Sequence, residues 1–91
     1  MIGLDRRSRA PATAVARGLA AYEKADYATA LKEWSAAAAA GNREAFYRLG
    51  LLYARGQGVI ANRADAARYY SQAAERGHAA AQHLRQPSNA L

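Results

Sequence analysis

The fold of this chain is decided by two adjacent stretches, Leu49-Gly-Leu-Leu-Tyr-Ala-Arg-Gly-Gln-Gly-Val59 and Asp65-Ala-Ala-Arg-Tyr-Tyr-Ser-Gln-Ala-Ala-Glu-Arg-Gly77. Apolar and small side chains recur in both at spacings of three and four residues, which predicts two amphipathic helices. Glycines follow each pattern, and glycine is the most common residue where a helix ends in a left-handed turn. The two stretches therefore predict a helix, a glycine-containing turn, a second helix and a stop.

The flanking segments repeat this plan. A shift of 36 residues aligns positions of similar size and type: Ala30 with Ala66, Trp34 with Tyr70, Ala37 with Ala73, Ala38 with Ala74, Gly41 with Gly77 and Ala45 with Ala81. The first helix of each pair needs a shift of 31 residues instead, which places Gly18 on Leu49 and Tyr22 on Tyr53. A period in this range, with two helices per unit, indicates a helical solenoid.

Capping residues predict where the helices begin. Asp26, Asn42 and Asn62 each precede a helical pattern, and their side-chain oxygens can accept the free amide hydrogens of the next turn. An earlier helix is expected over Pro11–Lys24, because proline suits the first turn. A short helix is expected from His78 to about Arg85. The chain is therefore predicted to form five helices.

The predicted core combines a few large side chains with many alanines. Its expected members are Val15, Leu19, Tyr22, Tyr27, Ala30, Leu31, Trp34, Ala37, Ala38, Ala45, Phe46, Leu49, Gly50, Tyr53, Ala66, Ala67, Tyr70, Ala73 and Ala74. We expect Trp34 and Tyr70 to lie between successive units, and Gly50 to let a neighbouring helix approach closely. Val59 and Ile60 are expected to be covered by their own glycine-rich loop.

The composition favours a folded domain without bound cofactors. The 91 residues include 26 alanines, and alanine is the best helix former. Cysteine is absent, which excludes disulfides and thiolate metal sites. His78 and His83 are five residues apart, so they do not share a helix face for one metal ion. We expect neither a metal nor a cofactor.

The chain is expected to contain one domain over residues 11–85, with a flexible lead-in at 1–10 and a flexible tail at 86–91. Its apolar runs are too short for a membrane-spanning helix, so no membrane partner is expected. No secretory signal is visible in the sequence as given. This favours the cytoplasm, with the periplasm as the alternative if the chain is a fragment.

One motif carries a family resemblance. Leu49-Gly50-x-x-Tyr53-x-x-Gly56-x-Gly58-Val59, followed by Ala66-x-x-x-Tyr70-x-x-Ala73-Ala74-x-x-Gly77-x-x-x-Ala81, resembles the Sel1-like repeat, a helix-pair repeat of the tetratricopeptide superfamily. The resemblance covers Ala45–Ala81 well. The first unit, over 22–34, resembles a tetratricopeptide motif more weakly, and a third unit breaks off after its first helix. The implied fold is all-α: a right-handed α-α superhelix of two helix-turn-helix repeats plus a C-terminal capping helix.

The resemblance also implies where a partner would bind. In tetratricopeptide-like domains the first helix of each pair lines a concave face that binds peptides or proteins. The positions expected on that face are Glu44, Tyr47, Arg48, Leu51 and Arg55 in the third helix, Ala16, Ala20 and Glu23 in the first, and His83 in the last. Tyrosine and arginine are favoured interface anchors. The alternative for Tyr47 and Leu51 is that they fill space between helices.

The expected function is therefore a non-catalytic adaptor that binds a protein or peptide. No nucleophile motif and no carboxylate pair suited to acid–base catalysis is present. The net charge of +6 leaves a second possibility, a basic surface of Arg43, Arg55, Arg63, Arg68 and Arg76 that binds nucleic acid or an acidic partner. Self-association through exposed repeat ends is a third. The alanine and arginine bias fits a GC-rich gene, and the resemblance implies a bacterial protein.

Overall fold

The computed structural model describes residues 11–85, and this part of the chain is all-α. Its helices are α2 (Pro11–Glu23), α3 (Tyr27–Ala39), α4 (Arg43–Arg55), α5 (Arg63–Glu75) and α6 (Ala79–Arg85). Each matches a helix that the sequence predicts. The expected lead-in at 1–10 and tail at 86–91 lie outside the described residues.

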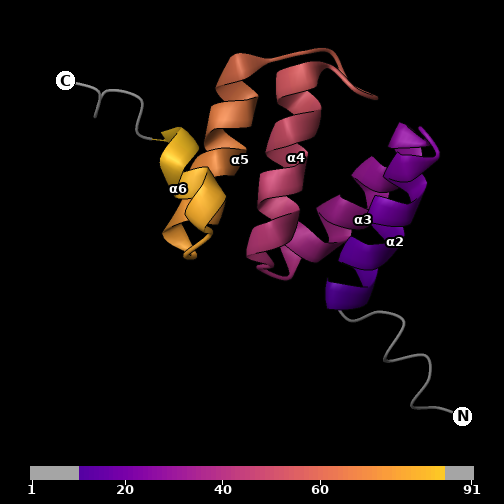
Figure 1. Ribbon diagram of the computed structural model, residues 1–91, viewed down its shortest axis with the longest axis horizontal. Helices are drawn as coiled ribbons and strands as arrows, with labels where there is room; N and C mark the ends of the chain where they lie inside the picture. The colour runs from indigo at the N-terminus through magenta and orange to yellow at the C-terminus, as the bar shows by residue number, and fades with distance from the viewer. Residues whose placement is uncertain (1–10, 86–91) are drawn as a thin grey trace, which may run out of the picture.

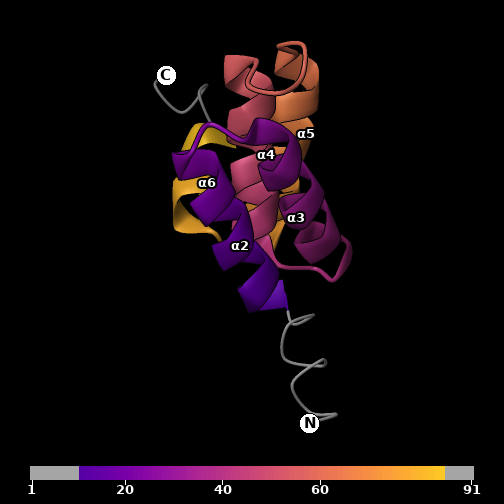
Figure 2. The same ribbon diagram turned by 90° about the vertical axis from the view of Figure 1, so that its right-hand side faces the viewer.

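The helices pack in chain order, with α2 against α3, α3 against α4, α4 against α5 and α5 against α6 (Figure 1). When the molecule is turned by 90°, α2, α4 and α6 lie on one side of the stack, and α3 and α5 lie on the other (Figure 2). We call the first side the α2/α4/α6 face. The arrangement is two helix pairs followed by one capping helix, as the repeat predicts.

The predicted starts and stops of the helices are confirmed. Asp26 accepts a hydrogen bond from the amide of Thr29 at 3.2 Å, and Asn42 and Asn62 accept equivalent bonds at the starts of α4 and α5. Gly41 and Gly77, which follow α3 and α5, have φ angles of 88° and 89°. Only glycine adopts this left-handed conformation without a steric penalty.

Trp34 is the largest fully buried residue, with 1% of its surface exposed. Its ring crosses from α3 onto α2, where the indole nitrogen donates a hydrogen bond to the carbonyl of Val15 at 3.1 Å. A Cβ atom at Gly18 would lie 2.3 Å from the same nitrogen. Gly18 therefore makes room for the indole, and the missing side chain allows α2 and α3 to pack closely.

In the second helix pair, too, a glycine makes room for an aromatic ring of the neighbouring helix. A Cβ atom at Gly50 of α4 would lie 2.5 Å from the ring of Tyr70 on α5, which confirms the predicted close approach at Gly50. These contacts join the two helices of one unit. Each ring also belongs to a core cluster with residues of the next unit, Ala45, Leu49 and Leu52 for Trp34 and Ala81 for Tyr70, so the prediction that Trp34 and Tyr70 lie between successive units is correct only in part. Arg48 of the next unit also lies over the indole of Trp34, with its guanidinium 5.9 Å from the ring centroid.

The register of the first helices also differs from the prediction. Helix α4 begins and ends 32 residues after α2, one more than the predicted 31, so Gly50 corresponds to Gly18. The buried residues of α2 are accordingly Ala14, Gly18 and Ala21, while the large side chains predicted for its core are only half-buried. At Gly18 the indole of Trp34 already occupies the space that a side chain would need.

Three further positions differ from the predicted core. Leu52 is fully buried, although the predicted stripe of α4 omits it. Ala67 is exposed, and Tyr69 packs near the core instead through ring contacts with Phe46 and Tyr53. Helix α4 is covered on both sides by α3 and α5, so its buried surface is wider than one stripe.

The loop between α4 and α5 touches the first unit. The Gln57 carboxamide accepts a hydrogen bond from the Tyr22 hydroxyl at 2.9 Å, and a Cβ at Gly58 would lie 2.7 Å from the Cβ of Tyr27. Ile60, by contrast, is 91% exposed, so the prediction that the loop covers it is wrong. The polar and glycine residues of the loop make the contact, and Ile60 points away from it.

Candidate functional site

The residues predicted to bind a partner belong to α2, α4 and α6, which form one face of the stack (Figure 2). Five of them are exposed: Ala16, Ala20, Glu23, Arg55 and His83. The other four are partly buried: Glu44, Tyr47, Arg48 and Leu51. The 32-residue register makes Val15 and Leu19, both half-buried, the α2 counterparts of Tyr47 and Leu51.

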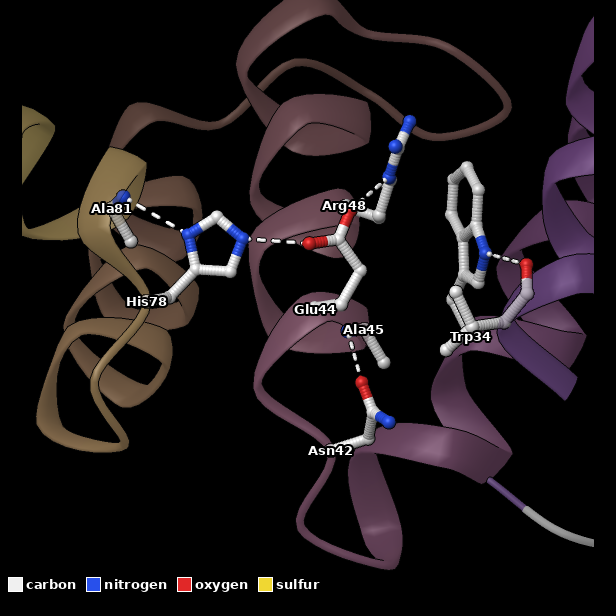
Figure 3. Close-up of polar contacts among 8 residues, drawn as sticks. Trp34, Asn42, Glu44, Ala45, Arg48, His78 and Ala81 are labelled. Carbon is white, nitrogen blue, oxygen red and sulfur yellow. Dashed lines mark hydrogen bonds and ion pairs between the residues drawn. The ribbon is translucent and has the colours of Figure 1, made fainter. Parts of the chain in front are cut away.

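Glu44 lies at the centre of a polar cluster on this face (Figure 3). One carboxylate oxygen contacts Nε2 of His78 at 2.7 Å, and the other accepts a hydrogen bond from Nε of Arg48, also at 2.7 Å. His78 precedes α6, whereas Glu44 and Arg48 are one turn apart on α4. The cluster therefore ties the start of α6 to α4. The sequence pattern does not predict this contact between the three residues.

Tyr47 contributes to packing as well as to the surface. Its ring stacks on the imidazole of His78, with centroids 4.4 Å apart and planes at 21°, and it meets Tyr70 of α5 at 6.0 Å. Tyr47 therefore partly fills space between helices, which is the alternative role that the sequence leaves open for it. Leu51 is half-buried one turn further along α4.

The surroundings of Glu44 determine its ionisation. Partial burial favours the neutral acid, but the hydrogen bonds from His78 and Arg48 and their positive charge outweigh it and hold the pKa below its ordinary value of 4.5. The carboxylate therefore stays ionised at neutral pH.

Acid should remove a stabilising contribution of Glu44. Because its pKa is lower in the folded state, the contribution is complete above the unfolded pKa and is lost as pH falls through the folded pKa. Urea denaturation between about pH 6 and about pH 3 should show a steeper loss of stability in the wild type than in Glu44→Gln. Equal slopes for the two proteins would contradict the assignment.

A second polar cluster joins the two helix pairs. Arg55, the last residue of α4, donates a hydrogen bond to the Tyr22 hydroxyl at 3.0 Å, and that hydroxyl donates in turn to Gln57. Gln57 also lies 3.5 Å from the hydroxyl of Tyr27. The sequence pattern predicts both tyrosines in the core but does not predict a contact for Gln57. The loop between α4 and α5, residues 56–62, is longer than the loop between α2 and α3, residues 24–26. This extra length is the signal that could have indicated a contact with the first unit.

The described residues show few features that suggest catalysis or metal binding. Within residues 11–85, no group of three or more histidines, aspartates or glutamates could hold a metal ion. Partial burial raises the pKa of Tyr69 and Tyr70, so both phenols stay protonated at neutral pH. None of the described helices is long and apolar enough to cross a membrane.

The arginines considered as a basic surface are largely engaged within the protein. Arg43 donates to the carbonyl of Arg76 at 3.2 Å, and Arg76 lies over the ring of Phe46 at 4.6 Å. Arg68 pairs with Asp65 at 3.2 Å.

The comparisons with known proteins agree with the architecture. No protein-family model matches the chain, and no curated protein sequence matches it either. The structure is similar to the crystal structure of a Sel1 repeat protein from Oxalobacter formigenes, with a TM-score of 0.79 and 30% sequence identity. That alignment covers 86% of this chain and 34% of the other, so the chain spans about a third of its length. The two helix pairs and the capping helix thus have the Sel1-like repeat fold that the sequence resembles.

Proposed function

We propose that the chain is a protein-interaction module that binds a protein or peptide through the α2/α4/α6 face. The proposal rests on one observation: α4, which lies on this face (Figure 2), carries the half-buried Leu51 and the exposed, cationic Arg55. Partly exposed apolar side chains beside an arginine are typical of interface anchors.

Arg55 is the best-defined anchor on this face. The Tyr22 hydroxyl holds its guanidinium at 3.0 Å, which reduces the conformational entropy that the side chain would lose on binding. Arg48, by comparison, already pairs with the Glu44 carboxylate. A partner should therefore place a hydrogen-bond acceptor or a carboxylate against Arg55 and an apolar side chain against Leu51.

Arg55→Glu should weaken partner binding at least tenfold, or about 1.4 kcal/mol, because it places a negative charge where the partner presents an acceptor. A partner is first identified by pull-down from the native source with mass spectrometry. Its affinity for the purified domain is then measured by isothermal titration calorimetry.

Arg63→Glu is the matched control, because Arg63 is exposed at the start of α5 on the opposite side of the stack. It should leave the affinity unchanged, and circular dichroism should show the same helix content in both variants. Tyr47→Ala is a less clean test, since Tyr47 also packs on His78. Equal affinity for the wild type and Arg55→Glu would move the binding site off this end of the face. Binding to RNA or DNA that falls steeply with salt would favour the nucleic-acid alternative instead.

A further inference from the structure

We propose that His78 is a pH-sensitive N-cap of α6, which releases the first turn of that helix when the imidazole is protonated. The position is equivalent to that of Asn42 in the preceding unit. Asn42 caps α4 and Asn62 caps α5, each by accepting a hydrogen bond from the amide three residues later. The 36-residue repeat places His78 on Asn42, and Nδ1 of His78 accepts from the amide of Ala81 at 3.3 Å.

The two contacts of the ring assign its tautomer. A backbone amide can only donate, so Nδ1 must carry a free lone pair to accept from Ala81. The proton of the neutral ring then resides on Nε2, which donates it to the Glu44 carboxylate at 2.7 Å. Each ring nitrogen thus has a distinct partner, one in α6 and one in α4 (Figure 3).

Protonation affects the two contacts in opposite ways. The second proton must go to Nδ1, where it removes the acceptor for the Ala81 amide. The contact between Nε2 and Glu44 remains and gains the attraction of opposite charges. An asparagine cap undergoes no such change, because its carboxamide does not titrate. Acid should therefore loosen the first turn of α6 while His78 stays attached to α4.

The groups around the imidazole are compatible with protonation at Nδ1. From α4, Glu44 and Tyr47 contact the ring, and Arg48 acts through Glu44. From α5, Tyr70 reaches Tyr47, and the end of that helix carries Arg76, whose carbonyl binds Arg43. From α6, the first turn supplies only Ala79, Ala80 and Ala81. The side chain of His78 is 13% exposed, so water can deliver the proton.

The tautomer is tested first, by ¹⁵N NMR of the ring nitrogens in the full chain at a pH above the imidazole titration. We expect the pattern of a neutral ring with the proton on Nε2 for His78. His83 is exposed and serves as the internal reference for a solvated imidazole. A proton on Nδ1 of the neutral ring would overturn the proposal, because that ring could not accept from Ala81.

The cap is tested by amide hydrogen exchange, expressed as protection factors that correct for the intrinsic effect of pH. Between pH values above and below the imidazole titration, the protection of Ala81 should fall about fivefold, the usual contribution of an N-cap. The protection of Ala45, which Asn42 caps, should stay constant. Protection of Ala81 that is independent of pH would overturn the proposal.

Two variants separate the cap from other effects of acid. His78→Asn restores the residue type that caps α4 and α5, so Ala81 should remain protected at both pH values. His83→Asn removes the other histidine within residues 11–85 and should keep the pH dependence of the wild type. A fivefold pH effect that survives in His78→Asn would show that another group causes it, and the proposal would fail.

Discussion

Trp34→Ala should lower the free energy of unfolding by about 3–5 kcal/mol, the usual cost of truncating a buried tryptophan. The indole is 1% exposed and fills the interface between α2 and α3 beside Gly18. Its removal opens a cavity and removes the hydrogen bond that the indole nitrogen donates to the carbonyl of Val15. Urea denaturation followed by circular dichroism measures the effect. A small domain has about 5–15 kcal/mol of total stability, so the variant should be only marginally folded at 25 °C.

Ile60→Ala is the matched control for this truncation. It also removes a large apolar side chain, but Ile60 is 91% exposed, so the free energy of unfolding should change by less than about 0.5 kcal/mol. A similar loss of stability in both variants would show that the protein is sensitive to any apolar truncation. An unchanged midpoint in Trp34→Ala would contradict the packing between α2 and α3.

Gly50→Ala should lower the free energy of unfolding by about 1–3 kcal/mol, even though alanine is the better helix former. The new methyl group would lie 2.5 Å from the ring of Tyr70, which is held between α4 and α5 by further contact with Tyr47. Either the ring must move or the helices must separate. Thermal or urea denaturation of the purified variant measures the cost.

A double-mutant cycle isolates that clash. In a Tyr70→Ala background the ring is gone, so Gly50→Ala should stabilise the protein by about 1 kcal/mol through helix propensity alone. The change of sign is the expected result. Gly50→Ala that is equally destabilising in both backgrounds would show that the close contact with Tyr70 is not the cause.

Local signals in the sequence predict the helices well. Asparagines and an aspartate mark three helix starts, and Gly41, Gly56 and Gly77 adopt the left-handed conformation where helices end. Each of these signals acts over one turn of chain, so the residue type alone is sufficient. The repeat adds the order of packing, because every unit has an apolar surface that it can bury only against its neighbour.

The candidate site was predictable only in outline. The repeat places Glu44, Arg48 and Arg55 on the first helix of a pair, which is the helix expected to contact a partner. The sequence does not show that Glu44 binds His78 across 34 residues or that Arg55 binds the hydroxyl of Tyr22. Such contacts depend on whether side chains on different helices are close enough to touch. The spacing of residues along the sequence does not show this. They also explain why we propose Arg55, and not Tyr47, as the main anchor for a partner.

The sequence by itself determined that this chain is a stack of two helix pairs and a capping helix, through its spacing, caps and glycines. Only the tertiary structure decided which residues fill the interfaces. It assigned the buried positions of α2 to Ala14, Gly18 and Ala21, and at Gly18 the indole of Trp34 leaves no room for a side chain. Propensity and capping act locally and can be read in order along the chain. Close packing is a property of pairs of surfaces, and it exists only once both helices are in place.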